Sequence, residues 1–195
     1  MTTPIILGID FGARLSGKTV MAWMGRDGFH LDRAAAGQDA DHFLEETIAW
    51  LNPAHIYVDA PLSLPENYRV MDAAGDWFYR RADRQLEAMS PMFLGGLTAR
   101  AIRLATRWRQ NGLQVRETWP RGLVRELTLD GYRHKGDGSI GMFMKTMRQA
   151  GFPQALPNPT DWHEVDALLA WWSGWRDLNG QAAVHGDPVE GQIVC

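Results

Sequence analysis

Acidic residues follow short apolar runs at three separate places in this chain, and such a pattern could do metal chemistry. Asp10 follows PIILGI, Asp59 follows HIYV and Glu117 follows LQVR. A fourth acid, Asp166, lies in the first turns of an expected helix over residues 162–178. Carboxylates that converge inside a fold repel one another unless a cation joins them. Since oxygen ligands suit Mg²⁺ or Mn²⁺, the four acids together predict a two-metal site for phosphodiester hydrolysis.

A simpler explanation stands beside this one. Taken one at a time, each acid is more easily explained as a surface residue or a helix cap, because strands often end where the chain meets solvent. His163, three residues before Asp166 on the same helix face, is equally open to two interpretations. It can serve as a metal ligand or proton shuttle, or it can pack on a tryptophan. The order of the elements is what favours a common site.

The segment 12–19 reads GARLSGKT and fits the phosphate-binding pattern G-x-x-x-x-G-K-[ST]. Such a loop requires a helix that begins at the Lys-Ser/Thr pair and directs its N-terminus at the phosphates. Here the β-branched Val20 follows, and Gly25 interrupts the sequence within two turns. We therefore expect a strand in a hairpin, and Arg14 and Lys18 can meet a phosphate only through their side-chain charges.

Basic side chains cluster on an expected helix over residues 76–89. Arg80, Arg81 and Arg84 lie there together with Asp83. One interpretation is a patch that contacts the phosphates of a substrate. The other is a solvated face on which Asp83 pairs with a neighbouring arginine. We retain the three arginines as candidate substrate-binding residues.

The elements expected to position these residues alternate between strands and helices. The first three strands should be antiparallel, because short turns join them. The segments 60–75 and 129–139 are expected loops, and 185–188 has the composition of a turn. Apolar, alternating and helical periodicities predict strands over 4–9, 19–24, 29–34, 55–59, 113–117 and 189–194, and helices over 39–51, 76–89, 97–110, 121–127, 140–150 and 162–178.

Composition sets outer limits on the fold and its partners. A chain of 195 residues with 45% hydrophobic residues is expected to form one domain over 1–195. The net charge of −3 excludes a global basic field, so nucleic acid would have to meet a local patch. A single cysteine, Cys195, excludes a disulfide framework within the chain and is compatible with the reducing cytosol, so a cytoplasmic location is expected. We expect neither a secretory signal nor a membrane span.

Six motifs in order, GIDFG, VDAPLSLP, RRADRQL, ETWP, HEVDALLAW and GDPVEGQIV, resemble the domain-of-unknown-function 429 family over nearly the whole chain. Members of that family are regarded as predicted nucleases of the ribonuclease H-like superfamily. The resemblance implies an α/β fold with a mixed five-stranded sheet, three strands antiparallel and two parallel, and with helices on both faces. It makes 60–75 an insertion, and it implies that Asp10, Asp59, Glu117 and Asp166 are metal ligands.

We therefore expect a Mg²⁺- or Mn²⁺-dependent nuclease whose substrate is a nucleic acid or a nucleotide. Two alternatives remain open, a nucleotide- or phosphometabolite-binding module of ATPase or kinase type, and a non-catalytic binding protein on the same fold. The tryptophans Trp171, Trp172 and Trp175 favour core packing or a homodimer contact over base stacking.

Overall fold

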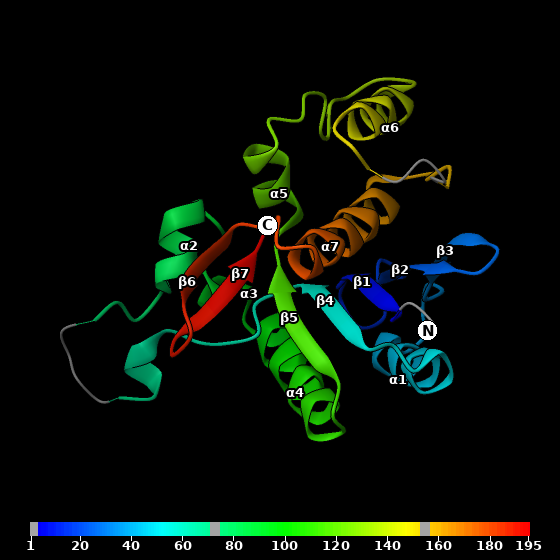
Figure 1. The fold of residues 1–195 in the computed structure, drawn as a ribbon. Coiled ribbons are helices and arrows are strands. Elements are labelled where there is room, and N and C mark those ends of the chain that lie inside the picture. Colours follow the sequence, from blue (N-terminus) through cyan, green and yellow to red (C-terminus); the bar gives the residue numbers. More distant parts are fainter. Residues whose placement is uncertain (1–3, 71–74, 153–156) are drawn as a thin grey trace.

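The computed structural model describes residues 4–70, 75–152 and 157–195. Among these residues, one mixed sheet holds seven strands in the order β3-β2-β1-β4-β5-β7-β6 (Figure 1). In chain order the strands are β1 (Ile6–Asp10), β2 (Val20–Gly25), β3 (Gly28–Arg33), β4 (His55–Asp59), β5 (Gln114–Thr118), β6 (Val184–Asp187) and β7 (Gly191–Val194).

The pairing of the strands confirms a mixed α/β architecture. β1, β2 and β3 form an antiparallel meander, as expected from their short turns. β4 pairs parallel to β1, and β5 pairs parallel to β4. β7 adds to β5 in parallel, and β6 pairs antiparallel to β7. The sheet is therefore larger than expected, because the C-terminal segment extends it by a hairpin.

The expected five strands and the expected turn over 185–188 were therefore wrong. The turn lies two to three residues later, where the Asp187 side chain accepts hydrogen bonds from the backbone N–H groups of Val189 and Glu190 at 2.9 and 2.8 Å. Gly186 and Gly191 both have positive φ, 88° and 129°. The glycine and proline residues that predicted the turn thus belong to a hairpin, and residues 185–187 still pair as part of β6.

The P-loop-like segment 12–19 turns the chain from β1 into β2. The strand β2 begins at Val20, directly after the Lys-Thr pair, so the expectation of a hairpin strand is confirmed. The side chain of Thr19 accepts a hydrogen bond from the backbone N–H of Gly12 at 3.2 Å and closes the loop on itself. No helix starts within the described loop to aim its amides at a phosphate.

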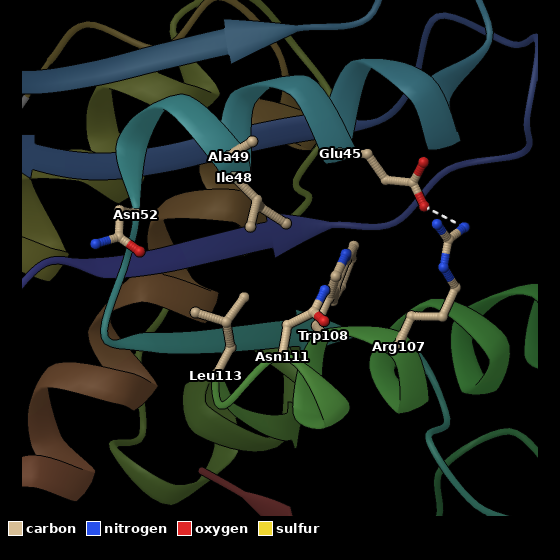
Figure 2. Close-up of a pocket in the computed structure, with 8 residues that line it drawn as sticks. All are labelled: Glu45, Ile48, Ala49, Asn52, Arg107, Trp108, Asn111 and Leu113. Atoms are coloured by element: carbon tan, nitrogen blue, oxygen red, sulfur yellow. Dashed lines mark ion pairs between the residues drawn. The ribbon is translucent and has the colours of Figure 1, made fainter.

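Two helices cover one face of the sheet, α1 (Ala40–Leu51) and α4 (Gly96–Gln110). Their apolar side chains pack on the alternate strand residues that include Ile9 and Val58. A groove of about 290 Å³ runs between the two helices, and the ion pair of Glu45 with Arg107, at 2.6 Å, lies in it (Figure 2). Its lining holds no cluster of acids.

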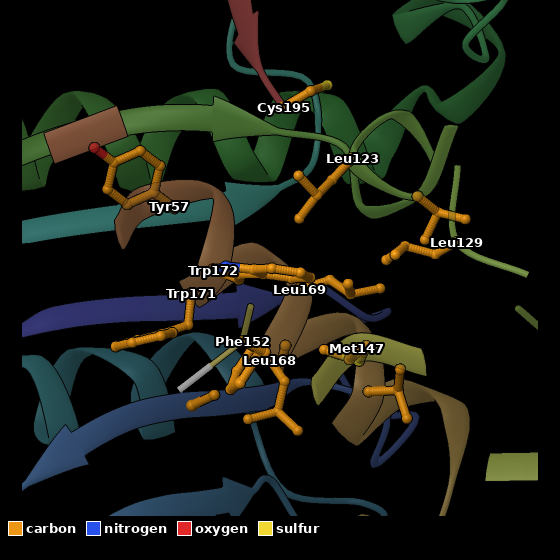
Figure 3. Close-up of a cluster of buried hydrophobic side chains, with 14 of the residues drawn as sticks. Tyr57, Leu123, Leu129, Met147, Phe152, Leu168, Leu169, Trp171, Trp172 and Cys195 are labelled. Carbon is orange, nitrogen blue, oxygen red and sulfur yellow. The ribbon is translucent and has the colours of Figure 1, made fainter. Parts of the chain in front are cut away.

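The opposite face is covered by α7 (Trp162–Leu178), the helix predicted over those residues. Trp171 and Trp172 of this helix are buried among leucine and phenylalanine side chains (Figure 3). α7 lies directly on β1 at Gly8, where a Cβ atom would come within 2.2 Å of the backbone nitrogen of Trp171. This close approach, which only glycine permits, brings the first turns of α7 beside the end of β1.

The remaining helices are short or lie outside the sheet layers. They are α2 (Arg81–Leu86), α3 (Pro91–Leu94), α5 (Pro120–Glu126), α6 (Ser139–Gln149) and a 3₁₀ turn η1 (Glu66–Tyr68).

The helix expected over 76–89 is wrong at both ends. Asp76 folds the start into a turn by accepting hydrogen bonds from the backbone N–H groups of Phe78 and Tyr79. Glu87 stops the helix in the left-handed region, at φ 53°. The expected loop over 60–75 contains η1, and its residues 71–74 lie outside the described residues.

Candidate metal centre

Three of the four expected acids meet at the carboxyl ends of the central strands. Asp10 and Asp59 are register partners on the parallel strands β1 and β4, and Asp166 lies in the second turn of α7. Each of the three offers a carboxylate oxygen, and these oxygens all lie within 4.8 Å of one another. Asp10 and Asp59 line a cavity of about 400 Å³. The convergence follows from the sheet register and from the close approach of α7 to β1.

The three carboxyl groups are poorly solvated and repel one another. Burial, followed by the charges of Asp10 and Asp166, raises the pKa of Asp59 well above its usual range. Burial also raises the pKa of Asp10. Burial and the neighbouring Asp10 raise the pKa of Asp166 to about 6. A site that favours protonated carboxyl groups is one that a bound cation would stabilise.

His163 is attached to this cluster through Asp10. Its Nδ1 lies 2.8 Å from Oδ2 of Asp10, and this hydrogen bond is the main reason that the pKa of His163 is raised. The N-cap residue Asp161 accepts hydrogen bonds from the backbone N–H groups of His163 and Glu164 and so fixes the first turn of α7. The side chain of His163 therefore lies at the carboxylates. This position favours the interpretation of His163 as a metal-site residue over packing on a tryptophan.

Two residues that the sequence did not single out reach Asp166 from the expected loop over 129–139. The hydroxyl of Tyr132 donates to Oδ1 of Asp166 at 2.7 Å, and the guanidinium of Arg133 donates to Oδ2. Arg133 adopts positive φ, 53°, which is uncommon for a residue other than glycine. It also lines the cavity that contains Asp10 and Asp59. A basic stretch of a glycine-containing loop was the only signal for it.

Glu117, the fourth expected ligand, lies apart from the three-carboxylate cluster. Its two oxygens accept hydrogen bonds from Arg80 at 2.6 and 2.7 Å, and one of them also accepts from the backbone N–H of Leu62 at 2.8 Å. Arg80 is completely buried and also binds Asp83 at 2.7 Å and the hydroxyl of Ser63 at 2.8 Å. Glu117 therefore lines the same cavity as Asp10 and Asp59, but its charge is already paired with that of Arg80.

Four of the five expected substrate-binding residues are spread over the surface. Arg14 pairs with Asp39 on the loop between β1 and β2, where Lys18 is also exposed. Arg81 lies 2.8 Å from Asp187, and Arg84 lies 2.6 Å from Asp76. Arg80, the residue that precedes α2, is inside the protein, where it pairs with Asp83 and Glu117. None of the five lies in the carboxylate cluster, and among them only Arg80 lines its cavity.

The arrangement fits a hard divalent cation by the chemistry of its donors. Asp10, Asp59 and Asp166 supply oxygen atoms from three different elements. Within the described residues, no hydrogen-bond donor reaches the Asp59 carboxylate, so its oxygens remain available. A partly buried carboxylate that has no partner and stands beside two other carboxylates is costly, which favours a cation as the missing partner.

Neither a scan of family models nor a search of curated proteins finds a match for this chain. Among the described helices, none is both long and apolar enough to cross a membrane.

Proposed function

We propose that this protein is a Mg²⁺- or Mn²⁺-dependent nuclease on a ribonuclease H-like fold. The observation that carries the proposal is that one carboxylate oxygen from each of Asp10, Asp59 and Asp166 lies within 4.8 Å of the others, at the carboxyl ends of the central strands. Three carboxylates from separate elements form a ligand set that is useful to an enzyme acting on phosphodiesters.

The sheet order supports the proposed fold. The strands β3, β2 and β1 are antiparallel, and β4 and β5 continue the sheet in parallel. This is the pattern that the family resemblance implies, with the β6–β7 hairpin as an addition at the β5 edge. The acids also lie at the carboxyl ends of neighbouring parallel strands, which is where α/β sheets commonly form their binding sites.

In the proposed site, Asp10, Asp59 and Asp166 would hold the metal. A bound divalent ion supplies Lewis acidity and lowers the pKa of its water. His163, hydrogen-bonded to Asp10, would orient that carboxylate and could hold a proton that leaves the site. Arg133 would move from Asp166 to the phosphate of the substrate, because a guanidinium binds phosphate oxygens in a bidentate fashion.

The substrate class proposed is a nucleic acid or a nucleotide. The cavity of about 400 Å³ is lined by apolar residues that include Phe11, Leu94 and Leu97, together with charged residues. Such a lining can receive a base or sugar beside a phosphate. It does not by itself distinguish DNA from RNA.

The test uses the full chain stripped with EDTA and then supplied with Mn²⁺ or Mg²⁺. Labelled single- and double-stranded DNA, single-stranded RNA and an RNA–DNA hybrid serve as substrates for the wild type, Asp59→Asn and Asp32→Asn. Asp32 is an exposed acid on β3 and provides the matched control. We expect metal-dependent cleavage by the wild type and the control, and a loss of at least about 100-fold in Asp59→Asn.

Two outcomes would contradict the proposal. Cleavage by Asp59→Asn at the wild-type rate would assign the activity to a contaminant. A wild type that binds neither Mn²⁺ nor Mg²⁺ in calorimetry would remove the metal chemistry. A nucleotide that raises the melting temperature without any cleavage would instead favour the alternative, a nucleotide- or phosphometabolite-binding module.

A further inference from the structure

A second polar cavity opens where β7 separates from β5. The two strands pair only at Glu117 with Ile193 and Thr118 with Val194 among the described residues. Figure 1 shows them approaching near their carboxyl ends and diverging below. The cavity between them has a volume of about 330 Å³. The segment 114–116 therefore has no strand neighbour on this edge of the sheet.

Three arginines from separate parts of the chain line this cavity. They are Arg69 after η1, Arg109 at the end of α4 and Arg116 on β5. Among the described residues, the only acid in the lining is Glu117, whose two oxygens are already occupied by Arg80. The three arginines therefore give this lining an excess of positive charge, although the net charge of the protein is −3.

Arg109 is the clearest unsatisfied cation in this lining. Its Nε and Nη2 donate to the backbone oxygen of Val115 at 3.2 and 2.8 Å, and no described carboxylate lies within ion-pair distance of it. Burial lowers the pKa of this guanidinium, although Glu117 opposes the effect. Arg109 is exposed overall, but its guanidinium is bonded only to a neutral carbonyl and has no compensating charge among the described residues.

The other two arginines are each held by a contact of their own. Arg116 lies 2.5 Å from Asp177 at the end of α7, and Arg69 donates to the backbone oxygen of Val189 in the β6–β7 turn. These contacts hold the two side chains in place, while Asp177 neutralises only one of the three charges. An anion in the cavity would offset the remaining two.

We propose that this β5–β7 cleft binds a phosphate group, with Arg109 as its principal ligand and Arg69 and Arg116 at its sides. Arginine forks match the oxygens of a phosphate, and the cavity exceeds the size of one phosphate, so it has room for more of the molecule that carries it. The phosphate can belong to a mononucleotide or to the backbone of a nucleic acid.

The cleft and the metal centre share one wall. Glu117 lines both cavities. The cleft nevertheless contains none of the three metal-centre carboxylates, so binding there needs no metal. The two sites can be tested apart, and failure of one leaves the other standing.

The experiment is a calorimetric titration in EDTA with inorganic phosphate, a nucleoside monophosphate and a short single-stranded DNA. The proteins are the full-length wild type, Arg109→Gln, Arg69→Gln and Arg107→Gln. Arg107 lies on the same helix, and its guanidinium pairs with Glu45 in the groove of Figure 2, so it is the matched control. Melting temperatures recorded on the same samples identify any variant that fails to fold.

We expect the wild type and Arg107→Gln to bind phosphate equally, and Arg109→Gln to bind about tenfold or more weakly, as loss of a charge-assisted hydrogen bond requires. Arg69→Gln should weaken binding less, and it keeps the test decisive if Arg109→Gln is unstable. Tighter binding of the mononucleotide than of the DNA identifies a free nucleotide as the source, and the reverse identifies nucleic acid. Absence of phosphate binding by the wild type, or equal binding by Arg109→Gln and Arg107→Gln, would overturn the proposal.

Discussion

Asp10 and Asp59 are direct register partners on the parallel strands β1 and β4, and their carboxyl groups reach the same cavity. Parallel register places equivalent side chains on the same face of a sheet. Two acids at the ends of these strands therefore stand beside each other, and α7 adds Asp166 from above. The repulsion among them is a consequence of the fold and has measurable effects on stability.

Removing one of these carboxylates should stabilise the metal-free protein. In EDTA at about pH 8, we expect Asp59→Asn to raise the free energy of unfolding by about 1 to 2 kcal/mol, because a poorly solvated charge beside two others is lost. Urea denaturation followed by tryptophan fluorescence measures this change. The same variant should gain no stability from Mn²⁺, whereas Asp32→Asn should behave as the wild type. A less stable Asp59→Asn would mark Asp59 as a structural residue.

The metal-free protein should lose stability as the pH rises. The pKa of Asp166 is raised from 3.8 to about 6, and burial raises the pKa values of Asp10 and Asp59 as well. The folded state therefore holds protons that the unfolded chain releases, so the stabilisation is complete below about pH 4 and is lost through pH 6 and above. His163, with its raised pKa, acts in the same direction.

The expected size of this effect is about 1 to 3 kcal/mol between pH 5 and pH 8 in EDTA. Chemical denaturation at several pH values measures it. Saturating Mn²⁺ should flatten the dependence, since a bound cation replaces the protons. Stability that increases from pH 5 to pH 8 in EDTA would contradict the raised pKa values.

Arg133 should compete with a metal for Asp166. Its guanidinium donates to the carboxylate that the proposed ion would use, so Arg133→Gln should bind Mn²⁺ more tightly, by about three- to tenfold, while cleaving substrate more slowly. Calorimetry measures the affinity, and Arg133→Lys, which keeps the charge, should stay near the wild type. Weaker Mn²⁺ binding by Arg133→Gln would mean that Arg133 orients the ligand instead of competing for it.

The buried arginine should matter far more to stability than its exposed neighbour. Arg80→Met leaves Glu117 and Asp83 without their cation, and breaking a buried pair in this way costs about 3 to 5 kcal/mol. Arg81→Met, next in the chain, removes only surface pairs and should cost less than about 1 kcal/mol. Thermal and urea unfolding compare the two. Equal losses would show that the Arg80 cluster contributes little net stability.

Local patterns in the chain predicted most of the elements. The periodicity of 162–178 predicts α7 at its observed bounds, and the β-branched Val20 after the Lys-Thr pair predicts β2 instead of a P-loop helix. Residues 76–80 were misassigned to a helix, because the Asp76 side chain captures backbone N–H groups that the sequence pattern does not reveal. The strand expected over 189–194 corresponds to β7, but its partner β6 was missed, because the turn-like composition of 185–188 does not reveal that these residues pair with β7.

The sequence by itself determined that Asp10, Asp59 and Glu117 end strands, and it placed them with the helix residue Asp166 in a common site as a hypothesis. Only the tertiary structure decided that Glu117 turns to Arg80 and that Arg133 reaches Asp166. The physical reason is that strand ends are set by local periodicity. Partners of a charged side chain depend instead on which distant segments the fold brings within hydrogen-bond distance.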